Sequence, residues 1–390
     1  MKQMSKMLVL ASLLLTKTMS GWSQNADSVN IVTTAVPFLR ISPDARAGGM
    51  GDVGISMEGD VNSVFWNHAK IPFNKRNGGF GITYTPWLRD LGLNDVYLIT
   101  AAGYNKINDN AAISGGMRFF SLGSITLTDF SGNTINTVRP AEFSLEGAYS
   151  LKLNDRMGIG IGLKYINSRL VVGDVGGVVY KAGNAVAGDI SYFYDGTFEN
   201  GSGTRFGVTL SNLGSKIGYT NDARNKDYIP ANLGFGVSYT SMMDEFNKIT
   251  FCLDVNKLLV PAPPVATGVF SVDSAKLDQY RNQGIVSSWF KSFGEGSGGL
   301  RAFQFSVGAE YAYNDQFFAR AGYFYEDRTK GNRRFFSAGA GFKQGGIGIN
   351  ISYIVPSGSG ITRNPLSNTI RLGLIFDFGD ATSPLSGKSR

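Results

Sequence analysis

The chain has 390 residues, with 37 Lys and Arg against 30 Asp and Glu, a formal net charge of +7 and 51 glycines. Three of the lysines fall within the first 17 residues, so the basic excess of the rest is small and argues against a nucleic-acid partner. The single cysteine, Cys252, and the single histidine, His68, exclude an internal disulfide and a zinc or transition-metal cluster of the usual ligands.

Residues 1–23 have the pattern of a secretory signal peptide. Lys2 and Lys6 form a basic start, Met7 to Leu15 an apolar core, and small residues precede a plausible cleavage site before Gln24. This core is too short to span a bilayer as a helix, and no later window approaches about 18 uninterrupted apolar residues. We therefore expect an exported β protein, either soluble or a transmembrane barrel.

Residues 24–77 are predicted to form an N-terminal plug. The glycines between Gly48 and Gly54 and the aromatic pair Phe65-Trp66 suit a compact, irregular segment that packs against surrounding walls, rather than a self-supporting helix. The G-x-G-x-x-G spacing from Gly49 matches a dinucleotide fingerprint, but no apolar strand precedes it and no helical repeat follows. A nucleotide site is therefore not expected.

From residue 78 to residue 378 apolar residues alternate with small or polar ones. In the clearest case Ile159, Ile161, Leu163 and Tyr165 alternate with glycines and Lys164. The apolar face suits lipid, and the glycine-rich, charged face suits a narrow lumen. We predict an all-β fold: a 14-stranded antiparallel transmembrane β-barrel with the plug inside. The strands are expected at about 79–87, 95–105, 111–123, 141–153, 156–169, 186–196, 204–214, 231–240, 247–257, 301–314, 317–327, 333–344, 346–356 and 368–378.

The connections alternate in length, which predicts the orientation of the barrel. Every second connection is short: 106–110, 154–155, 197–203, 241–246, 315–316 and 345. Those between are mostly long: 124–140, 170–185, 215–230, 258–300 and 357–367, with 88–94 and 328–332 as exceptions. Because bacterial barrels have short periplasmic turns, we expect both termini, and a tail at 379–390, in the periplasm.

Aromatic residues near the predicted strand ends fit the interfacial girdles of a membrane barrel. A ligand pocket is the alternative for individual residues, although the alternation already accounts for most of them. The residues are Tyr84, Trp87, Tyr104, Phe119, Phe120, Tyr239, Phe317, Phe318, Tyr323 and Tyr325.

The connection 258–300 is the most unusual external segment. Its first part is apolar and interrupted by prolines, which prevent strand pairing and reduce the entropy lost on docking. Ile285, Val286, Trp289, Phe290 and Phe293 are spaced like one face of a short helix. The segment either contacts a partner or folds over its own barrel mouth. The candidate partner-binding residues are Leu258, Leu259, Val260, Pro261, Pro263, Pro264, Val265, Trp289 and Phe290.

Catalysis is not expected. A hydrolase would need a histidine base near a nucleophile, and His68, within the plug, is better explained by a structural hydrogen bond. Cys252 is expected to face the lumen as a small residue, since nothing near it in sequence marks an activated thiol. We predict no catalytic, cofactor-binding or metal-binding residues.

The plug sequence resembles the N-terminal signature of FadL-like outer-membrane proteins, in which a small-Arg-small triplet, a glycine-rich run and an acidic residue precede Trp-Asn-Pro-Ala. His68 stands where that family usually has proline. Within the group, the mature chain most resembles the PorV family, the FadL-like barrels of the type IX secretion system. The residues that carry the signature are Ala45, Arg46, Gly49, Gly51, Asp60, Trp66, Asn67, His68 and Ala69.

The resemblance implies a non-enzymatic protein in the outer membrane of a diderm bacterium. Its implied partners are a giant translocon barrel (SprA/Sov-like), the C-terminal signal domains of secreted cargo, a PorU-containing attachment complex and outer-membrane lipid. It would accept cargo at the translocon and carry it to the sortase at the surface. The alternatives are a FadL-type channel for hydrophobic small molecules and a purely structural barrel.

Overall fold

The computed structural model describes residues 31–380, apart from 129–130, 176, 223–225, 295–297, 356–365 and 367. The expected signal peptide, residues 381–390 of the expected tail and most of the connection 357–367 lie outside the described residues. Within the described part of the chain, no helix is long and apolar enough to cross a membrane.

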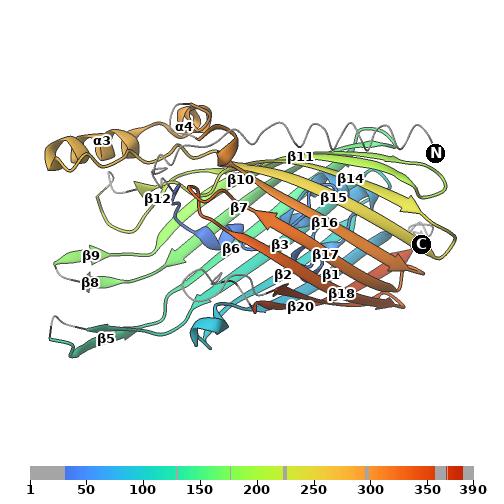
Figure 1. Ribbon diagram of the computed structural model, residues 1–390, viewed down its shortest axis with the longest axis horizontal. Coiled ribbons are helices and arrows are strands. Elements are labelled where there is room, and N and C mark those ends of the chain that lie inside the picture. Colours follow the sequence, from blue (N-terminus) through green and yellow to red (C-terminus); the bar gives the residue numbers. More distant parts are fainter. Residues whose placement is uncertain are drawn as a thin grey trace, which may run out of the picture.

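Fourteen antiparallel strands close into a barrel, in which β1 pairs with β20 (Figure 1). Every predicted strand occurs, and the predicted ends differ from the observed ones by at most three residues. The strands are β1 (Arg76–Pro86), β2 (Val96–Lys106), β3 (Ala111–Leu122), β6 (Ala141–Lys152), β7 (Met157–Arg169), β10 (Gly183–Thr197), β11 (Gly203–Gly214), β14 (Asn232–Met242), β15 (Asn247–Leu258), β16 (Phe303–Tyr313), β17 (Phe317–Tyr325), β18 (Arg334–Gln344), β19 (Ile347–Val355) and β20 (Ile370–Asp380).

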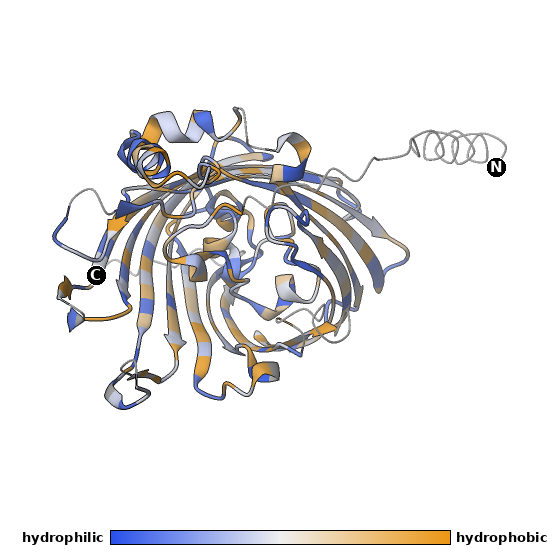
Figure 2. Cartoon of the chain, turned by 60° about the vertical axis from the view of Figure 1, so that its left-hand side comes forward, coloured by the Kyte–Doolittle hydropathy of each residue, from blue (hydrophilic) through white to orange (hydrophobic). Residues whose placement is uncertain are grey.

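The two faces of the strands differ as the alternation predicts. Along β7 the glycines and Lys164 are buried, whereas Ile159, Ile161 and Leu163 are exposed on the outer surface, and hydropathy alternates along many strands (Figure 2). The glycines are needed because the plug comes close: a Cβ on Gly162 would lie 2.7 Å from His68 Nε2. The inner face is therefore shaped by its contents.

The plug consists of short elements, three of which are begun by a polar cap. They are η1 (Pro37–Arg40), α2 (Ala45–Gly48), η2 (Val61–Phe65) and η3 (His68–Phe73). Asp44 caps α2, Asp60 caps η2 in a capping box with Ser63, and Asn67 caps η3. Helices this short are not stable alone. The plug therefore depends on its contacts with the barrel wall.

The barrel has a turn end, with short hairpins, and a loop end, where the other elements gather (Figure 1). These are η4 (Arg89–Leu91) and the two-stranded sheets β4 (Ile125–Thr128) with β5 (Thr134–Val138), β8 (Gly173–Val175) with β9 (Val178–Tyr180), and β12 (Ile217–Gly218) with β13 (Lys226–Asp227). The connection 258–300 adds α3 (Phe270–Asn282), α4 (Ile285–Lys291) and η5 (Gly299–Ala302). The helical spacing predicted from Ile285 is confirmed as α4. In both views α3 and α4 lie beside the barrel mouth (Figures 1 and 2).

Part of the aromatic-girdle prediction is wrong. Tyr104 packs with Val61 and Ile71 of the plug, and Phe120 packs with Phe38. Phe318 lies under the guanidinium of Arg320 in the lumen. Trp87 also packs against the buried cluster around Phe38. These four aromatic residues pack inward, against the plug or against an inward-facing guanidinium, which sequence position near a strand end does not reveal.

Candidate functional sites in the plug and at the loop end

Arg46 joins the plug to the barrel wall. Its Nε and Nη2 donate to the two oxygens of Glu310 on β16, at 3.0 and 2.8 Å, and its Nη1 donates to Asp60 Oδ2 and to the carbonyl of Glu58, both at 3.1 Å. Glu310 also accepts from Arg320 Nε at 2.6 Å. The two oxygens of Glu310 and the planar guanidinium form a bidentate pair. Two predicted signature residues, Arg46 and Asp60, are thus brought together.

The glycine-rich run lies directly against the wall. Gly51 has φ +70°, and a Cβ there would meet the backbone of Tyr323 at 2.7 Å, so only glycine fits. Its N–H donates to Ser337 Oγ at 2.8 Å. The N–H groups of Gly54 and Ile55 donate to one oxygen of Asp254 on β15, at 2.7 and 2.9 Å. A Cβ on Gly49 would lie 3.0 Å from the Cα of Gly339 on β18.

Trp66 fills the middle of the plug. Its indole N–H donates to Asp44 Oδ2 at 2.7 Å, and its ring lies where a Cβ on Gly54 would be. Lys70, almost completely buried, donates from Nζ to the carbonyl of Gly54 at 2.6 Å. Burial lowers the pKa of the Lys70 ammonium from 10.5 to about 8. These contacts hold the two halves of the plug together.

Asn67, His68 and Ala69 attach the plug to the opposite wall. The Asn67 amide donates to the carbonyls of Ile55 and Tyr192, both at 3.0 Å, and the Ala69 N–H donates to Ser191 Oγ at 3.1 Å. His68 is the first residue of η3, a position where proline is well tolerated. The departure from the usual proline therefore does not disturb the local geometry.

His68 also belongs to a buried charged cluster that sequence reasoning missed. Its Nε2 lies 3.5 Å from Asp189 Oδ2, and Lys164 Nζ lies 3.1 Å from both Asp189 and Glu146. Ligand atoms of His68, Glu146 and Asp189 lie within 4.8 Å of one another, but the Lys164 ammonium already lies between the two carboxylates. The arrangement suits a structural ion cluster better than a metal site. Cys252 is buried against Met50 and Val53 of the plug.

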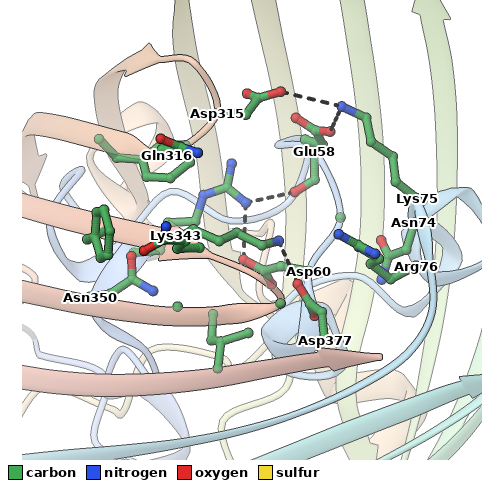
Figure 3. A pocket seen from close by; sticks show the side chains of 18 of the residues that line it. Glu58, Asp60, Asn74, Lys75, Arg76, Asp315, Gln316, Lys343, Asn350 and Asp377 are labelled. Atoms are coloured by element: carbon green, nitrogen blue, oxygen red, sulfur yellow. Dashed lines mark hydrogen bonds and ion pairs between the residues drawn. The ribbon is translucent and has the colours of Figure 1, made fainter. Parts of the chain in front are cut away.

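Cavities remain at both ends of the plug. At the turn end, a cavity of about 360 Å³ is lined by charged groups that are joined in ion pairs. Figure 3 shows Lys75 linked to Glu58 and Asp315, and Lys343 linked to Asp377. A second turn-end cavity of about 280 Å³ shares the Lys75, Glu58 and Asp315 side chains. At the loop end, a cavity of about 120 Å³ contains Arg118.

The candidate partner-binding residues divide into two groups. Leu258, Leu259, Val260 and Pro261 are buried, and the Leu259 N–H donates to the carbonyl of Ala231, so they continue the packing of β15. Pro263, Pro264 and Trp289 are half-buried, whereas Val265 and Phe290 are exposed. Sequence reasoning missed the exposed apolar residues around α3. We define the apolar loop-end surface as Val265, Val269, Phe270, Val286, Phe290, Phe293 and Leu300.

Two lysines and one tyrosine fix the C-terminal ends of α3 and α4 to the barrel. Lys216 Nζ donates to the carbonyls of Arg281 and Gln283 at the end of α3, and Lys257 Nζ donates to the carbonyl of Ser292 just after α4. Cations at helix C-termini also interact favourably with the helix dipole. Tyr280 OH donates to the carbonyl of Pro261 at 3.2 Å. The two helices are thus held in place while their apolar side chains face outward.

Comparison with solved structures identifies the fold. The toluene transporter TbuX of Ralstonia pickettii matches with a TM-score of 0.51 and 11% identity over 86% of this chain and 98% of that one. The monoaromatic hydrocarbon channel CymD matches with a TM-score of 0.52 and 12% identity over 87% and 99%. The chain therefore has the fold of the FadL-like outer-membrane barrels. No curated protein matches it.

The family model "Type IX secretion system protein PorV" matches residues 23–265. Because this match covers more than half of the chain, the protein belongs to the PorV family, whose members are outer-membrane components of type IX secretion. The resemblance predicted from the plug signature is confirmed at the level of the family. The family places the protein in type IX secretion.

Proposed function

We propose that this protein is a non-enzymatic carrier of the type IX secretion system. It binds the C-terminal signal domains of cargo at the giant translocon barrel and delivers them to the PorU-containing attachment complex at the cell surface. In this proposal the turn end and both termini face the periplasm, and the loop end faces the exterior, in line with the usual loop lengths of bacterial barrels. The plug, predicted at residues 24–77, closes the barrel.

The observation that carries the proposal is the apolar loop-end surface. Phe270 is 88% exposed, Leu300 81% and Phe290 75%. Large apolar side chains left in solvent along one connection suit a contact site. The ends of α3 and α4 are fixed by Lys216 and Lys257, so the surface loses little conformational entropy when a protein docks. The helices α3 and α4, which carry part of this surface, lie beside the barrel mouth (Figure 1).

The filled lumen favours this proposal over a channel for hydrophobic molecules. The wall is joined to the plug by Arg46 on one side and by Asn67 on the other. The larger turn-end cavity and the loop-end cavity both contain several charged side chains in their linings. A FadL-type channel, the second candidate, keeps the support of the fold, and a lipid copurifying within the lumen would favour it.

The test replaces the exposed apolar residues and measures export. The triple variant Phe270→Ser, Phe290→Ser, Leu300→Ser is expected to lose copurification with the translocon and to reduce cargo export several-fold, while the barrel stays folded on unheated gels. The matched control is Val172→Ser, Val178→Ser, Val179→Ser, which removes exposed apolar residues around β8 and β9 and should export normally. Normal export by the first variant would contradict the proposed surface.

A further inference from the structure

Two arginines without a partner lie at the loop end of neighbouring strands. Arg169 is the last residue of β7, Arg139 lies two residues before β6, and both are exposed. Within the residues that the structure describes, neither guanidinium makes a hydrogen bond or an ion pair. By contrast, Lys216 and Lys257 at the same end donate to backbone carbonyls. The two arginines therefore keep their donors and their charge for a group outside the protein.

The register of the sheet brings these arginines together on the outer wall. Arg169 is directly opposite Ala141, the first residue of β6. The Leu122 N–H donates to the carbonyl of Pro140, so the chain continues the line of β6 towards Arg139. Because Pro140 is buried and side chains alternate along a strand, Arg139 shares the outward side with Ala141. Diagonal neighbours on adjacent strands are about 7–8 Å apart, so both guanidinium groups can reach one anion between them.

The outer wall towards the turn end from the arginines has the character of a lipid-facing surface. Phe143 of β6 and Tyr165 of β7 lie on the same outward side, with ring centres 6.0 Å apart, and aromatic pairs of this kind mark the boundary between membrane and water. Further along the same side the wall is apolar and open, as expected where it meets acyl chains. The residues there are Leu145, Ile161, Leu163 and Val186, which are 48–68% exposed.

The distance from the aromatic pair to the arginines matches the depth of a lipid headgroup. Arg139 is four residues from Phe143, and Arg169 is four residues from Tyr165, which is about 13 Å along each strand. Strands of such barrels are tilted by about 35–45°, so the rise along the barrel axis is about 10 Å. The polar layer of a bilayer is about 5–8 Å thick on each side, and the long arginine side chain spans the remainder.

A third donor lies beside Arg169. Asn184 of β10 is exposed and directly opposite Asn167 of β7. Its Oδ1 accepts from Tyr165 OH and from Asn167 Nδ2, at 2.6 and 2.8 Å, whereas its Nδ2 has no acceptor within the described part of the chain. The three side chains thus offer donors alone. Donors are what the oxygens of a phosphate require, and a guanidinium binds phosphate with two parallel hydrogen bonds.

The nearest carboxylates do not neutralise the two arginines. Glu142, next to Ala141, is 2% exposed on the lumen side and accepts from Ser168 Oγ. Asp174 of β8 accepts from the N–H of Gly177 in its own turn. The outward positions of β6 and β7 between the aromatic pair and the loop end contain no acidic residue. An anion in this place would therefore meet a net positive charge.

We propose that Arg139, Arg169 and Asn184 form a site for the phosphate of an anionic lipid in the outer leaflet, whose acyl chains lie along Leu145 and Leu163. The two arginines hold the phosphate oxygens, and Asn184 donates to the same headgroup. The site rests on the proposed orientation of the barrel, in which the loop end faces the exterior. It is separate from the lumen and from the apolar loop-end surface, so lipid binding and cargo export can fail independently.

Native mass spectrometry of the purified full chain in detergent measures the binding of lipid A that carries two phosphates and of the same lipid after dephosphorylation. EDTA is present, so that divalent cations do not bridge phosphate to carboxylates. The phosphorylated lipid should bind at least tenfold more tightly. One cation near a membrane surface contributes a factor of about five. Arg139→Gln and Arg169→Gln should therefore each weaken binding about fivefold, and the double variant about 25-fold.

Matched variants separate this site from general charge and from folding. Both arginines are exposed and unpaired, so the variants should keep the migration of a folded barrel on unheated gels. Arg156→Gln removes an exposed cation at the turn end and should leave lipid binding unchanged. Arg169→Lys should bind with intermediate affinity, because an ammonium cannot form the two parallel hydrogen bonds.

Three results would overturn the proposal. The first is equal binding of the phosphorylated and the dephosphorylated lipid, and the second is normal lipid binding by the folded double variant. The third is displacement of the lipid by an equal concentration of inorganic phosphate, which would show a site for free phosphate in which the apolar wall takes no part.

Discussion

Replacement of Arg46 by methionine should loosen the plug without unfolding the barrel. Removal of one partner from a buried ion pair costs about 3–5 kcal/mol. Glu310 keeps Arg320 at 2.6 Å, so the lower end, about 3 kcal/mol, applies. Local opening of the plug should then become about 100 times more frequent. The amides most affected should be those near Arg46, including Ala47, Gly54 and Ile55.

Hydrogen exchange with mass spectrometry on the detergent-solubilised chain measures this opening directly, because amide exchange of a transiently open segment follows its opening equilibrium. Peptides within residues 44–71 should exchange faster in Arg46→Met, and peptides from β6 and β7 should not. Arg156→Met, at an exposed turn, is the control. Unchanged exchange in the plug of a folded Arg46→Met barrel would refute the role assigned to this ion pair.

Three further predictions test the plug in other ways. Gly51→Ala should lower the free energy of unfolding by more than about 2 kcal/mol, from left-handed strain and the contact with the Tyr323 backbone, whereas Gly147→Ala, with nothing within 4 Å of its Cβ, should change the urea midpoint little. His68→Pro should fold, and hydrogen exchange in its plug should be normal. Ala69→Pro loses the backbone N–H that donates to Asn67 and Ser191, so hydrogen exchange in its plug should be faster. Equal exchange rates in the two variants would count against the assigned geometry. Burial lowers the pKa of Lys70 from 10.5 to about 8, so between these pH values Lys70 holds a proton in the unfolded chain but not in the folded one. The free energy of unfolding should therefore rise from pH 8 to pH 10.5, and the rise should be smaller in Lys70→Met.

The barrel could be predicted from the sequence because each strand carries its own evidence. In β7, Gly158, Gly160 and Gly162 alternate with large apolar residues, and this pattern has the period of a strand with one face in lipid. Loop lengths supplied an independent check. The strand ends differ by a few residues because fraying and turn hydrogen bonds are not visible in composition.

The contacts within the lumen could not be predicted in the same way. Arg46 and Glu310 are 264 residues apart, and a charged residue on an inward-facing position does not reveal its partner. The cluster of His68, Asp189, Glu146 and Lys164 was missed for the same reason. The available signal was the position of each charge on the glycine-rich face of a strand.

The helix α3 was missed because its sequence lacks an apolar stripe. Its apolar residues do not recur with helical spacing, and none of its side chains is buried. Of the predicted partner-binding residues, Leu258–Pro261 are buried against the barrel, whereas Val265 and Phe290 are exposed. The exposed residues begin at Val265.

The most direct test of the proposed secretion role is a mild-detergent pulldown of the tagged chain from its native outer membrane, with identification of every copurifying component. The account predicts a very large barrel together with exported proteins that share a C-terminal domain, and loss of both when Phe270, Phe290 and Leu300 are replaced by serine. Recovery of the barrel alone, with fatty acid or another apolar compound bound in its lumen, would contradict the account and support a transporter.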